Sequence, residues 1–189
     1  VRGATAPAGY TPAPRSVRFS ATQRQPMRIT FITTGGTIDK VYFDAQSRFE
    51  VGETTLEHML RQGEVAFDYA ILPLMRKDSL EMGDADRAAI RAAIEASDDR
   101  RFVITHGTDT MVQTALALEG LRERTIVLTG ALSPARFQQS DAPINIGLAI
   151  GAAQTCPPGV YLAMNGRIFP PHGVRKNRER NRFERVSDS

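Results

Sequence analysis

The chain has 189 residues, of which 41% are hydrophobic and 24% are charged, as expected for a globular domain with a full core and not for a fibrous or low-complexity protein. Residues 1–26 contain four arginines and no acid, and residues 175–189 contain six basic against three acidic residues, so the net charge of +3 leaves the body of the chain at −4. An acidic body lacks the basic surface that phosphate binding needs, so we expect no nucleic-acid partner. Apolar runs fall short of about 18 residues, so we expect no membrane-spanning helix.

The N-terminal segment, residues 1–26, is rich in Ala, Pro, Thr, Ser and Arg and has no hydrophobic periodicity. This composition predicts a disordered extension that takes no part in the core, and the lack of an apolar stretch argues against a secretory signal. We favour Met27 as the natural start. The alternative is an organellar transit peptide, which is also rich in arginine and poor in acids.

From Met27 onward, apolar stretches alternate with helical patterns. Residues 28–33 predict a buried strand, followed by a glycine loop and a hairpin around residues 41–43 and 49–51. A capping-box pattern at residues 54–57 predicts a helix that continues to Arg61. The later strands are expected at residues 69–72, 102–105, 125–129 and 160–164, and the later helices between them at 84–97, 110–121 and 142–155. We expect the basic residues at 175–185 to form mostly a solvated helix face.

Strands that alternate with helices indicate parallel pairing, with helices on both faces of the sheet. The predicted fold is therefore α/β, a three-layer αβα sandwich around a mostly parallel, flavodoxin- or Rossmann-like sheet. We expect it to form a single domain over residues 27–189.

Cysteine and histidine usage limits the chemistry that is available. Cys156 is the single cysteine, which allows no intrachain disulfide and favours a reducing compartment, so we predict a cytoplasmic protein. The three histidines, His58, His106 and His172, have no cysteine or second histidine at ligand spacing, so we expect no metal site.

Two loops that are rich in threonine, glycine and aspartate directly follow predicted strands. Residues 34–39 (TGGTID) follow the strand at 28–33, and residues 105–110 (THGTDT) close the strand at 102–105. The carboxyl ends of parallel strands share one edge of the sheet, where open α/β folds bind ligands, and paired glycines let the backbone turn close to a ligand. Neither loop has the lysine of a phosphate-binding loop, which favours hydroxyl chemistry over nucleotide binding.

A threonine hydroxyl needs a neighbouring base before it becomes nucleophilic. Thr37 has Tyr42 five residues later, and Thr108 has Asp109 beside it. Lys176 lies in a polar tail that is able to return to Thr108 and accept its proton, and the loop glycines leave N–H groups free to face an oxyanion. These residues suggest acyl transfer. The structural alternative is that threonine is common at strand ends because of its β propensity and its use in helix caps.

The two loops resemble the signature motifs of the bacterial-type L-asparaginase/glutaminase family. Their order and spacing agree, as do residues 129–134 (TGALSP) and 140–145 (SDAPIN), and the similarity extends over residues 27–178. The resemblance implies hydrolysis of L-asparagine to L-aspartate and ammonia, without a metal or an organic cofactor. It also implies a homo-oligomer.

The resemblance assigns catalytic roles residue by residue. Thr37 matches the family's first threonine nucleophile, and Thr108 and Lys176 match its second threonine and its catalytic lysine. We expect Thr37 to attack first, with Thr108 as the alternative. A tyrosine of the family's lid is replaced by Phe49, which cannot carry a proton, so Tyr42 is the expected substitute.

The resemblance also assigns the substrate contacts. Asp109 matches the substrate-binding aspartate and is suited to hold the α-ammonium, since a carboxylate makes a charge-assisted hydrogen bond with it. Ser79 matches the serine that binds the α-carboxylate. Gly36 and Gly107 are expected to place backbone N–H groups against the substrate.

The resemblance leaves alternatives open. Usual family members have a C-terminal domain that lends an acidic residue to a neighbour's site, and we expect that domain to be absent here, as in the short-chain, single-domain members. The rivals are an amidase that acts on glutamine or an aminoacyl-tRNA amide, and a non-catalytic amino-acid sensor. A sensor has no need of the lysine relay, which favours an enzyme.

Overall fold

The apolar stretch after Met27 forms an interior strand of the main sheet. In the computed structural model, which describes residues 27–39, 55–135 and 137–188, strand β1 (Arg28–Thr33) has every residue after Arg28 buried. Packed layers on both faces of the sheet explain this burial, because a strand inside a doubly covered sheet has no solvent-facing side. The other strands of the sheet are β2 (Asp68–Pro73), β3 (Arg101–Thr105), β4 (Thr125–Thr129), β5 (Gly159–Met164) and β6 (Arg167–Phe169).

The strands follow the order β2-β1-β3-β4-β5-β6, and all neighbours pair in parallel except β6, which is antiparallel to β5. The order of the first five strands is that of flavodoxin-like sheets. The predicted fold class is therefore confirmed. The direction of winding reverses between β1 and β3, and the carboxyl ends at such a reversal are where open α/β sheets bind ligands.

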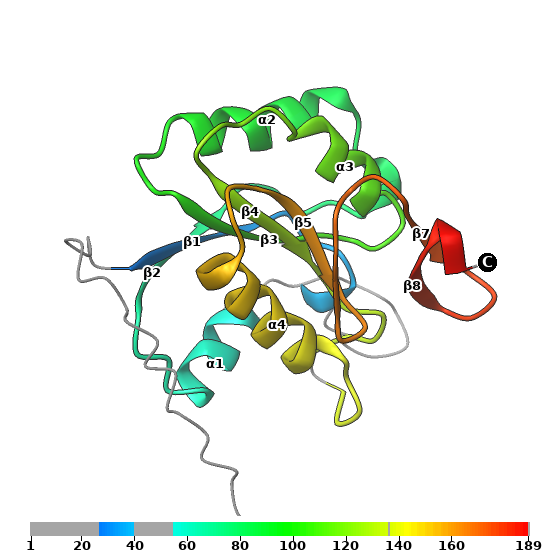
Figure 1. Ribbon diagram of the computed structural model, residues 1–189. Coiled ribbons are helices and arrows are strands. Elements are labelled where there is room, and N and C mark those ends of the chain that lie inside the picture. The colour runs from blue at the N-terminus through cyan, green and yellow to red at the C-terminus, as the bar shows by residue number, and fades with distance from the viewer. Residues whose placement is uncertain (1–26, 40–54, 136, 189) are drawn as a thin grey trace, which may run out of the picture.

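Helices cover both faces of the sheet, as Figure 1 shows: α2 (Asp84–Glu95) and α3 (Met111–Ala117) lie on one face, and α1 (Thr55–Gln62) and α4 (Ala142–Thr155) lie on the other. Each face has its own apolar core. Ile90 and Ile94 of α2 are one turn apart and pack into the first core, and Leu56 and Leu60 of α1 do the same in the second.

Helix α3 is shorter than the sequence pattern predicts. It ends at Ala117, although we expected the helix to reach residue 121. Gly120 has φ of 85°, a left-handed conformation that ends helices. Arg91 from α2 donates to the carbonyl oxygens of Ala117 and Glu119 at 2.9 and 2.6 Å, which satisfies the exposed end.

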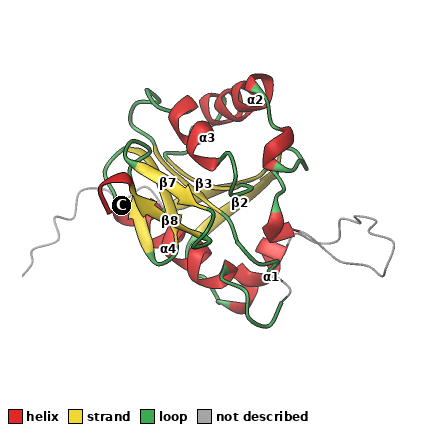
Figure 2. Ribbon diagram, turned by 90° about the vertical axis from the view of Figure 1, so that its right-hand side faces the viewer, coloured by secondary structure: helices red, strands yellow, loops and turns green. Residues whose placement is uncertain are grey.

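The basic C-terminal residues form a β-hairpin, and the expected helix face is wrong. Strands β7 (Val174–Asn177) and β8 (Arg182–Arg185) pair antiparallel in a separate two-stranded sheet. Buried Val174 and Phe183 anchor the hairpin to the first apolar core. Figures 1 and 2 show that the hairpin stands beside the carboxyl ends of the central strands.

Several predictions fall on residues outside those that the structure describes, namely the extension at 1–26, the hairpin at 41–51 and Tyr42 with Phe49. Within residues 27–39, 55–135 and 137–188, no helix is long and apolar enough to cross a bilayer.

Candidate active site

Three loops that leave the carboxyl ends of β1, β2 and β3 are tied together by hydrogen bonds. The Thr34 N–H and hydroxyl both donate to the Thr105 carbonyl, at 3.1 and 2.8 Å. The Thr34 carbonyl in turn accepts from the Lys77 N–H at 3.0 Å. Thr110 donates its hydroxyl to the Ser79 carbonyl at 2.7 Å. The bonds fix the loops relative to one another at the point where the winding of the sheet reverses.

Glycines allow these loops to touch. Gly36 has φ of 91°, and a Cβ there would lie 2.6 Å from the Gly107 backbone nitrogen. A Cβ at Gly107 would lie 2.6 Å from the Ser79 Oγ. Only a residue without a side chain fits such approaches, and positive φ has the same requirement. Gly36, Gly107 and Ser79, which the sequence assigns to substrate binding, therefore lie next to one another.

The two threonines follow this pair of glycines. Thr37 opens a short 3-10 turn (Thr37–Asp39) and is partly exposed, and the next residue, Ile38, is buried in the core. Thr108 is 5% exposed. Because Gly36 and Gly107 touch, both threonines start from the same part of the sheet edge, as the motif spacing predicts.

Lys176 of β7 reaches the second threonine across 68 residues of sequence. Its Nζ donates to the Thr108 Oγ1 at 2.7 Å and to the Asp109 Oδ1 at 3.0 Å. The lysine side chain is only 16% exposed. The return of Lys176 to Thr108 is thus present in the structure, although the lysine lies in a strand and not in an irregular tail. The arrangement links a hydroxyl, an amine and a carboxylate in one chain of hydrogen bonds.

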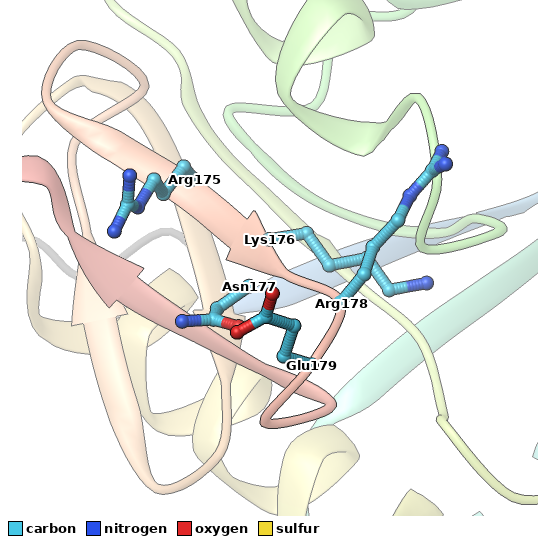
Figure 3. Close-up of a pocket in the computed structure, with 5 residues that line it drawn as sticks. All are labelled: Arg175, Lys176, Asn177, Arg178 and Glu179. Carbon is cyan, nitrogen blue, oxygen red and sulfur yellow. The ribbon is translucent and has the colours of Figure 1, made fainter.

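Strand alternation explains why Lys176 points toward this site. Figure 3 shows Lys176 and Arg178 on one side of the hairpin and Arg175 and Asn177 on the other. Arg175 and Asn177 both donate to the Glu184 Oε1, at 3.0 and 2.9 Å. The Asn177 amide and the Arg175 guanidinium hold the pKa of the Glu184 carboxyl below its usual range. Glu184 therefore fastens the neighbours of Lys176 on the far side of the strand.

Arg178 and Glu184 are site residues that the sequence did not single out. Arg178 Nη2 lies 3.6 Å from the Asp109 Oδ1, and its side chain is 75% exposed. It lines a solvent-open depression with Arg175, Lys176, Asn177 and Glu179 (Figure 3). The signal that was available in the sequence was the pair of apolar residues among the charged ones, Val174 and Phe183, both of which are buried in the structure.

The Ser79 side chain has an unmet hydrogen-bonding capacity. It is 1% exposed, and within the described residues its Oγ has no hydrogen-bond partner. Leaving a buried hydroxyl unpaired costs about 1–3 kcal/mol. Since Ser79 also touches Gly107, this cost is located at the site, where a ligand is able to supply the missing partner.

His106 supports the loop that contains Gly107 and is fully buried. Its Nδ1 lies 2.7 Å from the Gly107 carbonyl and its Nε2 lies 2.9 Å from the Thr114 hydroxyl. A carbonyl only accepts, so Nδ1 carries the proton and Nε2 accepts from Thr114. Burial lowers the pKa of His106 to about 4, against the opposing effect of the Gly107 carbonyl. The neutral ring therefore holds the loop in place.

The loop after β4 is also anchored by side chains. Asp141 accepts from the N–H groups of Leu132 and Ser133 at 3.0 Å and from the Asn145 amide at 2.8 Å. Among the described residues, no cluster of three or more histidine, cysteine, aspartate and glutamate side chains is placed to hold a metal ion. The metal-free chemistry that we expect stays a prediction.

Comparison with known proteins gives a consistent picture. The family model described as "Asparaginase, N-terminal" matches residues 28–186. The probable periplasmic L-asparaginase of Haemophilus influenzae is 31% identical over 159 residues, which are 78% of this chain and 46% of the relative. L-asparaginase 2 of Escherichia coli is 30% identical over 169 residues, 84% of this chain and 49% of the relative. The chain thus spans about half the length of these curated relatives.

Solved structures show the same likeness in three dimensions. The thermostable L-asparaginase of Thermococcus kodakarensis matches with a TM-score of 0.74 and 27% identity, over 84% of this chain and 51% of that structure.

Proposed function

Because the chain belongs to the asparaginase family, whose N-terminal model covers residues 28–186, we propose that it hydrolyses the side-chain amide of L-asparagine to L-aspartate and ammonia. The observation that carries this proposal is the chain of hydrogen bonds from Lys176 to Thr108 and Asp109. It supplies a proton relay and an anion at the sheet edge where ligands bind in this fold.

In the proposed binding mode, Asp109 accepts hydrogen bonds from the α-ammonium of the substrate. The buried Ser79 hydroxyl, which has no partner in the described residues, donates to the α-carboxylate. Backbone N–H groups of the glycine loops around Gly36 and Gly107 face the amide oxygen, where negative charge develops during attack.

In the proposed first step, the Thr37 Oγ attacks the amide carbon, and its proton passes to Tyr42, a residue outside those that the structure describes, while Tyr42 passes its own phenolic proton to the amide nitrogen. The C–N bond breaks, and ammonia leaves with a proton to give a β-aspartyl ester of Thr37. In the second step Thr108 takes a proton from water and passes its own proton to the Lys176 amine, while the hydroxide adds to the ester carbonyl carbon. The ester C–O bond then breaks, and the relayed proton goes to the Thr37 Oγ, which releases aspartate and restores the Thr37 hydroxyl.

Ammonia release from L-asparagine and from L-glutamine tests this proposal. We expect asparagine-selective release, with a loss of about 10²-fold or more in Thr37→Ala and in Lys176→Met. Release from glutamine alone would keep the chemistry and change the substrate. Binding of asparagine without release would favour a sensor instead. Near-normal release by folded Thr37→Ala would overturn the role of Thr37 as the nucleophile.

The order of the two threonines needs its own measurement. If Thr37 attacks first, Thr108→Val reacted with asparagine and quenched in acid retains a protein that is heavier by one aspartyl group, and the group maps to Thr37 by mass spectrometry. An aspartyl group on Thr108 in Thr37→Ala would reverse the order.

The homo-oligomer, the cytoplasmic location and the division into residues 1–26 and 27–189 stay predictions. Light scattering after size-exclusion chromatography measures the first, and a dimer or larger assembly is the expected result.

A further inference from the structure

The hairpin of β7 and β8 brings a group of basic side chains to the edge of the candidate site, and three of them have an acidic partner within 3.5 Å among the described residues. Arg175 and Arg182 lie against the Glu184 carboxylate, at 3.0 and 3.5 Å. Lys176 is bonded to Thr108 and Asp109. Glu184 therefore holds two of the positive charges on the side of the hairpin that faces away from Lys176.

Arg178 differs from these neighbours. Its contact with the Asp109 Oδ1 is long, at 3.6 Å, and its side chain is 75% exposed. Figure 3 shows the guanidinium on the same side of the hairpin as Lys176, and the Glu179 carboxylate on the side of Asn177. Arg178 is thus a cation beside Asp109 with most of its five donors open to a ligand.

The charges around Asp109 are unsuited to a ligand that is only a cation. One carboxylate faces two cations there, Lys176 and Arg178. A third cation on Asp109 would be repelled by both of them unless it arrived with its own anion. An α-amino acid brings such an anion, because its ammonium and its carboxylate are attached to the same carbon atom.

We propose that Arg178 is a specificity-determining residue that binds the α-carboxylate of the substrate, and so restricts the enzyme to amides of free, zwitterionic amino acids. The proposal rests on the proposed function, with the α-ammonium on Asp109. Arginine suits the role because its planar fork of N–H groups matches a carboxylate. Ser79 then binds one oxygen of that carboxylate and Arg178 approaches the other.

The test compares L-asparagine with L-aspartic diamide, in which a neutral amide replaces the α-carboxylate. In Arg178→Gln we expect kcat/KM for asparagine to fall at least 10-fold, mostly through KM, while kcat/KM for the diamide stays within about 2-fold. Arg180→Gln is the matched control. It removes the same charge from the same hairpin, and within the described residues no hydrogen bond or ion pair joins the Arg180 side chain to the site. An equal loss on both substrates, or none on asparagine, would overturn the proposal.

A binding measurement tests the role of Arg178 independently of the proposed reaction. Calorimetry compares L-aspartate with L-isoasparagine, in which the α-carboxylate is an amide. Weaker binding of aspartate alone to Arg178→Gln, by 10-fold or more, supports the role of Arg178 even if the native chain releases no ammonia. Equal effects on both ligands, or no binding of either to the native chain, would overturn it.

Discussion

The hydroxyl of Ser79 is buried against Gly107 and, within the described residues, meets no hydrogen-bond partner. Removing an unsatisfied group relieves a cost, whereas removing one that binds a ligand weakens binding. We therefore expect Ser79→Ala to leave the free energy of unfolding unchanged or to raise it by about 1 kcal/mol, while KM for asparagine rises about 10-fold.

Thr34→Val is the matched control for Ser79→Ala, because the Thr34 hydroxyl donates to the Thr105 carbonyl at 2.8 Å. Loss of that satisfied bond should lower the free energy of unfolding by about 1 kcal/mol. Urea denaturation and asparagine kinetics measure both effects. A Ser79→Ala protein that is less stable and has an unchanged KM would assign this hydroxyl a structural role.

His106 makes stability depend on pH in a window that its shifted pKa defines. The pKa is lowered from 6.5 to about 4 by burial, so between these values the unfolded chain binds a proton that the folded chain does not. The contribution of neutral His106 to the free energy of unfolding is fully present above pH 6.5. It is lost as the pH falls toward 4, by roughly 3 kcal/mol in total. We expect urea denaturation at several pH values to show a shallower acid loss in His106→Gln than in the native chain. Parallel curves would contradict this role.

At the scale of elements, the five parallel strands were predictable because they are apolar runs with β-branched residues, whereas the short antiparallel strand β6 was not predicted. The helices α2 and α4 were found within two residues at each end. The hairpin of β7 and β8 was missed, because its residues are mostly Arg, Lys, Asn and Glu, which are not typical of strands. Lys176 is bonded to Thr108, 68 residues away, a partner that a single sequence does not reveal, and Arg175 is bonded to Glu184 across the hairpin itself.

The same hairpin predicts how Glu184 affects catalysis. Its carboxylate is 3% exposed and fastens Arg175 and Asn177, the two neighbours of Lys176. In Glu184→Ala we expect these neighbours to lose their anchor, Lys176 to lose its fixed approach to Thr108, and kcat to fall about 10-fold or more.

Glu184→Gln separates positioning from charge, since its amide oxygen still accepts from Asn177. We expect this variant to recover part of kcat, and KM to change little in either variant. A fall in the melting temperature that accounts for the whole loss of activity would show instead that Glu184 acts only on folding.

At the scale of the whole molecule, the site lies where the two halves of the sheet diverge, and apolar cores on both faces hold it. Loops after β1, β2 and β3 supply the glycines, the threonines and Ser79, and the distant hairpin supplies Lys176. The motifs identified the loops because strand-end residues are local in sequence. Arg178 was not identified, since its relation to Asp109 arises only when residue 178 is folded back onto residue 109.

The arrangement of the sheet also bears on the extension at residues 1–26. Strand β1 pairs with β2 on one side and β3 on the other, so its backbone has no open edge for a preceding segment to join. We predict that a chain starting at Met27 keeps the native melting temperature within about 2 °C and keeps kcat for asparagine.

Strand β2 is at the end of the described sheet, and Tyr69 and Ile71 are only half-buried there. If residues 1–26 packed on the sheet, they would cover this strand and slow its hydrogen exchange. Calorimetric melting and hydrogen exchange of the shortened chain check both points. A lower melting temperature, together with faster exchange in β2 than in the full chain, would show that the extension belongs to the fold.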